Sequence, residues 1–430
     1  MKEKANEIEA TLRTEGLAPT GEAVAHADLP GGARRAVLVA GAAADELVRV
    51  SFDPSKAPAR GRLLEVVSPS ADRAAPPCPH TRVCGGCDWM HLTRDAQRAA
   101  HLVHVREAVG IDATFHSAPR DVGWRIRARL HVDARRGPLR VGFYGPRSHE
   151  PAQVDRCVVL EERIEAARAR VAPLLAGARG DGEAMLALGA RGRPVMMLRW
   201  TRELPPEVFA RVDAEVRAGH WDGVRLQCGE ARRPADFGDP APEVMGADGA
   251  PLVLAPGGFS QAHAEVNVEL AHRVAELVPE QARVVELYAG AGNLSVLIAK
   301  RAAQLVAVES SEEAVSAARK NLSARSLEAR VTCADAARFE IPKSTTAIVL
   351  DPPRTGARDA CEGIKASRVR HVIYVSCDLA TLRRDLAILE ARASGARDAW
   401  RVVSADAFEM FPHTSHIETV VHLERQRGKA

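Results

Sequence analysis

The sequence predicts an α/β fold in which a doubly wound parallel sheet follows a small N-terminal β-barrel and a central α+β region. Three observations lead to this prediction. From residue 256 onward, short apolar stretches alternate with helical ones, as they do around parallel sheets. The last two strand-like stretches, 401–408 and 417–424, leave no room for a helix between them, so we expect an antiparallel last strand. Residues 21–70 contain short strand-like stretches separated by turns, as in small barrels.

The chain divides where its composition changes. Its 430 residues suit two or three domains. A proline-rich stretch, 68–80, ends the barrel, and the regular α/β pattern begins near residue 256. The expected domains are 1–72, 73–255 and 256–430. Residues 1–15 are charged, so we expect a weak helix or a tail there. A helix near 93–110 is expected to pack on the C-terminal domain.

The C-terminal domain is expected to begin with a helix over 262–278. Its strands are expected at 283–288, 304–309, 330–335, 346–351, 371–376, 401–408 and 417–424. In open parallel sheets, ligands bind outside the carboxyl ends of the strands. The functional residues of this domain should therefore lie directly after these strands.

The first two strands are followed by features of a nucleotide-binding site. "ELYAGAGNLS" places Gly290 and Gly292 in a tight turn before a helix, where a backbone can approach a ligand closely. Glu309 ends the second strand, where a carboxylate can bind both hydroxyls of a ribose. NAD and S-adenosylmethionine both carry that ribose. The dinucleotide pattern requires glycine or alanine at Ser295, which argues against NAD.

Two further strand ends carry candidate chemistry. In "LDPPRTG", Asp351 precedes two prolines, and this stiff turn would fix a carboxylate and a carbonyl suited to holding a planar base. "HVIYVSCDLATLRRD" places Cys377 between a strand and a helix. A free cysteine is usually a small buried hydrophobe, but this one lies where parallel sheets place their chemistry. Cys228, Cys333 and Cys361 are interpreted as ordinary.

Four other cysteines suggest a metal centre. "CPHTRVCGGC" spaces Cys78, Cys84 and Cys87 as C-x5-C-x2-C, and Cys157 lies far along the chain. Eight cysteines in a reducing compartment are not expected to form a disulfide framework. Four thiolates suit either zinc or an iron-sulfur cluster, and their spacing does not decide between the two.

The charge pattern points to a polyanionic partner. Eight arginines lie between Arg120 and Arg147, interleaved with Trp124, Phe143 and Tyr144. Such a stretch can contact nucleic-acid phosphates, and the alternative is a solvated strand face. The net charge of +3 says little by itself. The start of the chain lacks an apolar core and no 18-residue apolar run follows, so we expect a cytoplasmic protein without membrane contact.

Five motifs in order resemble those of the RNA uridine-5-methyltransferase family, which uses S-adenosylmethionine to make 5-methyluridine in ribosomal or transfer RNA. They are "FSQAHAEVN", "ELYAGAGN", "LDPPRTGA", "VSCDLATLRRD" and "DAFEMFPHTSHIETV". The resemblance spans nearly the whole chain and implies a Rossmann-like methyltransferase domain. The N-terminal barrel resembles, loosely, the RNA-binding TRAM module of these enzymes.

The resemblance also implies residue roles. It places S-adenosylmethionine against Gln261, Tyr288, Asn293, Glu309, Asp335 and Asp351. It makes Cys377 the nucleophile and Glu418 the base. His413 and His416, in the motif before Glu418, are candidate proton carriers, but we expect them to be structural. It implies a four-iron four-sulfur cluster on Cys78, Cys84, Cys87 and Cys157. His263 stands where the family has Asn, and Leu379 where it has Pro.

The expected reaction begins with addition of the Cys377 thiolate to carbon 6 of uracil, which makes carbon 5 nucleophilic. A helix N-terminus near Cys377 is expected to favour the thiolate. The target base must leave its stack to reach this cysteine. The iron-sulfur motif favours 23S ribosomal RNA over transfer RNA as the substrate. The alternative from another class is a catalytically silent RNA-binding protein on the same fold, and we expect a monomer.

Overall fold

The computed structural model describes residues 7–229, 233–391 and 398–427. The chain forms two compact units, each described by itself below. The first contains the chain up to His104 together with His413–Ser415. The second contains Val105–Pro412 and the chain from His416 onward. None of the described helices is long and apolar enough to span a bilayer.

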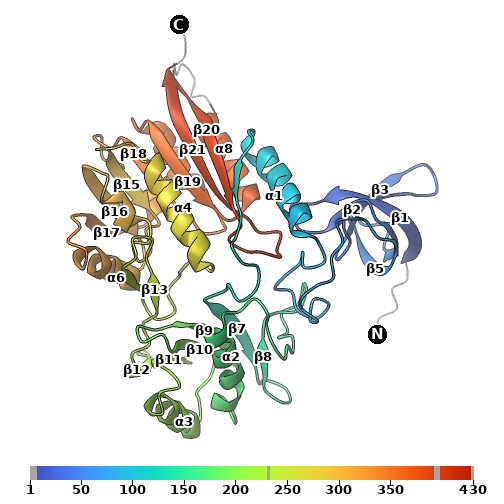
Figure 1. Cartoon of the computed structure of the whole chain (residues 1–430), viewed down its shortest axis with the longest axis horizontal. Helices are drawn as coiled ribbons and strands as arrows, with labels where there is room; N and C mark the ends of the chain where they lie inside the picture. The colour runs from blue at the N-terminus through green and yellow to red at the C-terminus, as the bar shows by residue number, and fades with distance from the viewer. Residues whose placement is uncertain (1–6, 230–232, 392–397, 428–430) are drawn as a thin grey trace. The chain divides into compact units, whose positions relative to one another are not determined.

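The first unit contains the predicted barrel, a closed sheet of five strands drawn in blue in Figure 1. In barrel order the strands are β1 (Ile8–Leu17), β2 (Ala23–Asp28), β3 (Arg34–Val39), β5 (Ala59–Ser68) and β4 (Leu47–Phe52). Alternate side chains point inward, and Val37, Val39, Val48 and Val50 have no exposed surface. The barrel predicted from the turn pattern is therefore confirmed.

The expectation of a helix or a tail over residues 1–15 is wrong for the part that is described. β1 pairs antiparallel with β4, from Ile8 opposite Phe52 to Arg13 opposite Leu47. Leu12 and Thr14 are buried, whereas Thr11, Arg13 and Glu15 are exposed, which is the two-residue period of a strand with one solvated face. Few of these inward positions are apolar, so the period is hard to recognise in the sequence.

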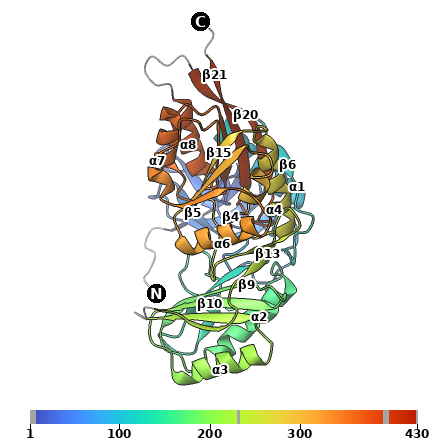
Figure 2. The ribbon, with the colours of Figure 1, turned by 90° about the vertical axis from the view of Figure 1, so that its left-hand side faces the viewer.

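Besides a two-stranded hairpin, the described part of the second unit contains two larger sheets. The smaller has six strands in the order β12, β11, β10, β9, β7 and β8. Their bounds are Ala235–Gly238, Gly223–Cys228, Pro194–Trp200, Asp181–Leu188, Ala128–Asp133 and Arg140–Gly142. One face carries Leu130, Leu186 and Leu198, which pack with helices α2 (Glu162–Leu174) and α3 (Pro206–Arg217) in one core (Figure 2).

The larger sheet has eight strands in the order β17, β16, β15, β18, β19, β21, β20 and β6. Their bounds are Arg330–Cys333, Gln304–Glu309, Arg283–Leu287, Ala347–Leu350, His371–Ser376, Glu418–Arg427, Asp398–Phe408 and Thr114–His116. The first five are mutually parallel, and β21 is antiparallel to β19 and to β20. The predicted parallel sheet with an antiparallel end is confirmed. β6, which was not predicted, pairs parallel with β20.

Helices cover both faces of the larger sheet. One core contains residues of α4 (Ala264–Leu277), α5 (Ser295–Ile298) and α6 (Glu312–Ser323). The other contains residues of α7 (Arg358–Ala366) and α8 (Leu379–Glu390). Val105 and Val109 of α1 (Arg94–Val109) lie in that second core. This is the three-layer arrangement of a doubly wound α/β domain.

Candidate active site

The register of the parallel strands brings the predicted site residues to one edge of the sheet. Leu287 pairs with Val308 of β16 and with Leu350 of β18, and Leu350 pairs with Tyr374 of β19. Tyr288, Glu309 and Asp351 therefore lie at the same level, at or directly after their strands. This is the edge where open α/β sheets bind their ligands.

The glycine turn is tied to Glu309. Gly290 and Gly292 have φ values of 55° and 89°, a region that glycine enters without strain. The backbone N–H of Gly290 donates to Oε2 of Glu309 at 3.0 Å, and the N–H of Ser311 donates to Oε1 at 2.8 Å. Each carboxylate oxygen has a second lone pair, so Glu309 can still accept hydrogen bonds from a ribose.

A pocket with about 660 Å³ of empty space, part of it open to solvent, lies beside this turn. Four of the six predicted cofactor residues line it: Gln261, Tyr288, Asn293 and Asp351. Its apolar wall comes from Phe259 and from the hairpin of β13 (Glu243–Met245) and β14 (Pro251–Val253). The pocket thus combines an apolar surface with amide, phenol and carboxyl groups.

The other two predicted cofactor residues do not line this pocket. Glu309 is held to its wall through Gly290. Asp335 is exposed at the end of β17 and caps a short 3-10 helix by accepting from the N–H of Ala337 at 2.9 Å. His263, the position that departs from the family, is buried and stacks on Trp124 with 5.5 Å between the ring centroids.

Two carboxyl groups line the pocket, the buried Glu286 and the partly exposed Asp351. Burial raises the pKa of Asp351 to about 7, and Gln261 donates to its Oδ2 at 3.5 Å. Burial raises the pKa of Glu286 to about 8, and the hydroxyl of Ser295 donates to it at 2.6 Å. Sequence reasoning missed Glu286, although a glutamate inside the apolar strand "RVVELY" was a usable signal.

Cys377 and Glu418 face each other across two strand ends. Ser376 is paired with Thr419 in the antiparallel ladder between β19 and β21, so Cys377 lies opposite Glu418 one step further on. Glu418 is only 2% exposed. Burial, and then the charge of Asp351, raise its pKa well above the usual value, while Arg354 opposes this shift.

The helix after Cys377 begins as expected. α8 starts at Leu379, and the Asp378 side chain caps it by accepting from the N–H of Thr381 at 2.9 Å. The expectation that this helix favours the thiolate stays a prediction, and other groups act against it. Burial, and then the charge of Glu418, raise the pKa of Cys377 to about 12.

Arg354, which the sequence analysis did not single out, places a positively charged guanidinium near Cys377 and Glu418. It lowers the pKa of both Cys377 and Glu418, and its guanidinium lies 3.4 Å from Nε2 of His416. The other histidine of that motif has a structural role in the first unit. The N–H of His413 donates to Gln97 at 3.0 Å, and its carbonyl accepts from the backbone of Trp89.

The predicted metal cysteines are distributed over both units. Cys78, Cys84 and Cys87 lie in one loop of the first unit, where the N–H of Gly86 donates to Sγ of Cys84 at 3.4 Å. Cys157 lies in the second unit and packs against the core that the six-stranded sheet forms with α2 and α3. Among the described residues, the one set of three or more metal-type ligands within 4.8 Å of each other is His371, His422 and Glu424.

Several arginines of the basic stretch have acidic partners. Arg120 pairs with Glu265 at 2.9 Å and Arg135 with Asp133 at 3.0 Å. Arg127 donates to the carbonyl of Ser260 at 2.6 Å, and burial lowers its pKa to about 10. Some arginines of this stretch therefore hold the protein's own structure together, and others leave their charge exposed to solvent.

Comparisons with known proteins agree with this geometry. Residues 330–426 match the family model "tRNA (Uracil-5-)-methyltransferase", and residues 250–367 match "Methyltransferase small domain". A 23S rRNA (uracil(1939)-C(5))-methyltransferase RlmD from Alkalilimnicola ehrlichii is 31% identical, over 96% of this chain and 95% of that protein. The enzyme of the same name from Halomonas elongata is 34% identical, over 97% of this chain and 91% of that protein.

A solved structure shares the fold. The tRNA (uracil-54, C5)-methyltransferase of Pyrococcus abyssi, in complex with S-adenosyl-L-homocysteine, aligns over 97% of this chain and 100% of its own with a TM-score of 0.74 and 19% identity. The family is shown by the two relatives above 30% identity, which match nearly the full length of the chain. The chain belongs to the RNA uracil-5-methyltransferase family, enzymes that depend on S-adenosylmethionine.

Proposed function

We propose that this protein methylates carbon 5 of a uridine in 23S ribosomal RNA, with Cys377 as the nucleophile and Glu418 as the base. The observation that carries the assignment of roles is the placement of a thiol opposite a buried carboxyl group, next to Asp351 at the edge of the sheet. The choice of 23S RNA is supported by the names of the relatives above 30% identity.

The residues of the pocket fit S-adenosylmethionine, which supplies the methyl group when bound. Gln261, Tyr288, Asn293 and Asp351 would line its site, because they already share one pocket with an apolar wall. Glu309 would accept from the ribose hydroxyls, with Asp335 at the neighbouring strand end. The strained φ of Tyr288, 63°, turns the chain at the point where the pocket begins.

Cys377 would add to carbon 6 of the uracil, and the electron pair of the C5–C6 double bond would move toward the O4 oxygen. Carbon 5 would then take the methyl group, and the electron pair of the broken S–CH3 bond would stay on the sulfur of the departing S-adenosylhomocysteine. Glu418 would remove the carbon 5 proton, which restores the double bond and expels the Cys377 thiolate. A carboxylate with a raised pKa is a stronger base than a solvated one, so the burial of Glu418 suits this step.

We also propose that Cys78, Cys84, Cys87 and Cys157 hold a four-iron four-sulfur cluster. The paired glycines Gly85 and Gly86 support this choice, because they allow the backbone to approach cluster sulfides closely. The Gly86 N–H donated to Cys84 is the kind of bond that tunes cluster thiolates. The cluster would order this loop, since methyl transfer requires no electron.

Incubation of the purified protein with labelled S-adenosylmethionine and fragments of 23S RNA tests the function. The expected product is 5-methyluridine at one position, located by mass spectrometry of nuclease digests. Transfer RNA serves as the competing substrate. Labelling of transfer RNA alone would move the proposal to that substrate, and cofactor binding without methylation of either RNA would favour a silent RNA-binding protein.

A further inference from the structure

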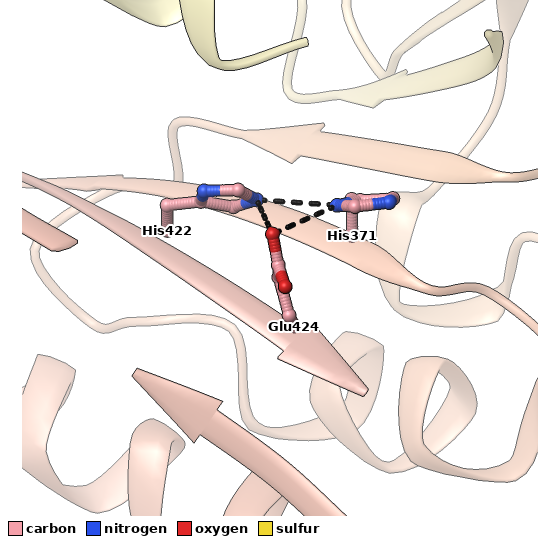
Figure 3. A group of neighbouring side chains, drawn as sticks. All are labelled: His371, His422 and Glu424. Carbon is pink, nitrogen blue, oxygen red and sulfur yellow. Dashed lines mark hydrogen bonds and ion pairs between the residues drawn. The ribbon is translucent and has the colours of Figure 1, made fainter. Parts of the chain in front are cut away.

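We propose that His371, His422 and Glu424 bind one divalent transition-metal ion of the zinc type, at the opposite end of β19 from Cys377. The three side chains point toward one another from two neighbouring strands (Figure 3). This inference does not depend on the proposed function, because none of the three residues lies at the edge that carries the candidate active site.

The ligand atoms are close to the spacing that a tetrahedral ion requires. Nδ1 of His371 lies 3.3 Å from Nε2 of His422. Oε1 of Glu424 lies 3.8 Å from the first nitrogen and 3.9 Å from the second. Zinc bonds of about 2.0–2.2 Å in a tetrahedron set neighbouring ligand atoms about 3.3–3.6 Å apart. Small side-chain rotations would therefore close the triangle around an ion.

The strand register fixes these positions. His371 lies directly opposite Glu424 in the antiparallel ladder, and His422 is two residues from Glu424 on β21, so all three share one face of the sheet. The side chain of His422 is 11% exposed, that of His371 27% and that of Glu424 41%. An ion can therefore enter from solvent, and water can fill the fourth position.

The adjacent strand offers a partner for that water. Ser404 pairs with His422 across β20 and β21, and its buried hydroxyl has no hydrogen-bond partner within the described structure. Two arginines lie nearby: Arg273 is paired with Asp406 at 3.0 Å, and Arg401 is the exposed register partner of Glu424. The alternative to a metal is a plain ion pair between Glu424 and protonated imidazoles.

A bound ion would fasten β19 to β21. Cys377 and Glu418 lie at the other end of the same pair of strands. Six residues separate His371 from Cys377, which is about 20 Å at roughly 3.3 Å for each residue. The ion would thus stabilise the pairing on which the candidate active site depends without touching the reacting atoms.

Titration of the full-length protein with Co²⁺ in competition with a chromophoric chelator tests the proposal. Apart from any ion held by Cys78, Cys84, Cys87 and Cys157, which would show thiolate charge-transfer bands, one ion per chain should bind with an absorption spectrum lacking those bands. His371→Ala should weaken binding on the order of 100-fold or more, since even outer-shell partners are worth about 10–100-fold. Ser404→Ala should weaken it about tenfold. His371→Cys should retain binding and gain thiolate bands.

The matched control is His220→Ala, which removes an exposed histidine that is also paired with a glutamate. It should bind Co²⁺ as the wild type does. Circular dichroism and S-adenosylmethionine binding establish that each variant is folded. Equal Co²⁺ affinity of the wild type and His371→Ala, or a wild-type spectrum with thiolate bands alone, would overturn the site and leave the ion pair.

Discussion

Cys377, the proposed nucleophile, is a partly buried cysteine. Its pKa of about 12 means that hardly any thiolate exists at neutral pH before substrate binds. Burial and the nearby Glu418 cause this, and Arg354 is the neighbouring group that opposes it. Such a nucleophile is protected from stray alkylation and oxidation, because the thiolate is the reactive form. We therefore predict that RNA binding changes the surroundings of the thiol before it adds to uracil.

Substitution of the two catalytic candidates should stop the reaction at different points. Cys377→Ala cannot add to carbon 6, so it should bind RNA and cofactor without forming a covalent complex. Glu418→Gln keeps the nucleophile but lacks the base, so the methylated adduct should persist with its carbon 5 proton. Denaturing gels with 23S RNA fragments should show a shifted protein–RNA band for Glu418→Gln and none for Cys377→Ala.

Thr419→Ser, which retains a hydroxyl beside Glu418, serves as the control for that experiment and should turn over without a persistent band. Normal turnover by Glu418→Gln would move the base elsewhere. The next candidates would then be His416, which lies beside Arg354, and a water held by Asp351.

Arg354 should set the pH dependence of the reaction. Its positive charge lowers the pKa of Cys377 and of Glu418, so Arg354→Gln should raise both. Methylation needs both groups deprotonated at their steps. The acidic limb of kcat/KM against pH should therefore move to higher pH in this variant. Arg358→Gln, an exposed arginine four residues away, should leave the profile in place; the same profile for both variants would remove Arg354 from this role.

At the scale of the elements, β15 carries a carboxyl group whose burial links stability to pH. The pKa of Glu286 is raised to about 8 in the folded protein, against about 4.3 in an unfolded chain. The folded state therefore binds the extra proton between these values, and stability is lost as pH rises through this window. Within the window, the free energy of unfolding should fall by up to about 1.4 kcal/mol for each step of one in pH.

Glu286→Gln should remove that loss, because the amide stays neutral and can still bond to the Ser295 hydroxyl. Urea midpoints measured between pH 5 and pH 9 should fall less steeply for the variant than for the wild type. Asp351 retains its own raised pKa in both proteins, so part of the slope will remain. Parallel slopes would mean that Glu286 is ionised in the folded protein.

The elements that the sequence predicts well are those with a continuous apolar stretch. The five parallel strands and the β20–β21 pair are of this kind, and so the edge with Asp351 and Cys377 could be located in advance. β6 could not be predicted, because a strand of three residues is too short to show an alternating apolar pattern. Its pairing with β20 depends on tertiary contacts. The raised pKa of Cys377 also could not be predicted, because burial is its largest cause and burial depends on segments far away in the sequence.

For the molecule as a whole, the cysteine loop and Cys157 lie in different units of the chain. Protein purified without oxygen should be brown and carry about four irons per chain, since four thiolates suit one such cluster. Cys78→Ser and Cys157→Ser should lose iron and lower the thermal midpoint, while Cys333→Ser, an exposed cysteine outside the set, should do neither. Stoichiometric zinc without iron in the purified protein would contradict the cluster.

RNA binding should depend on the exposed part of the basic stretch. Arg129 is suited to a test because its side chain is 53% exposed and its nearest carboxylate, on Glu183, is 3.9 Å away. Each phosphate contact releases counterions, so the logarithm of affinity should fall with the logarithm of salt by about 0.7–0.9 per contact. Arg129→Gln should weaken RNA binding and reduce the size of that slope by the amount expected for one phosphate contact. Filter binding at several salt concentrations measures both quantities.

Arg127 is unsuited to the same test, because it is hydrogen-bonded to Ser260 at the pocket wall and its loss would disturb cofactor binding as well. The matched control is Arg217→Gln, an exposed arginine on α3 paired with Asp213, which should leave both affinity and slope unchanged. If Arg129→Gln bound RNA with the wild-type slope, this position would belong to a solvated strand face rather than to the RNA surface.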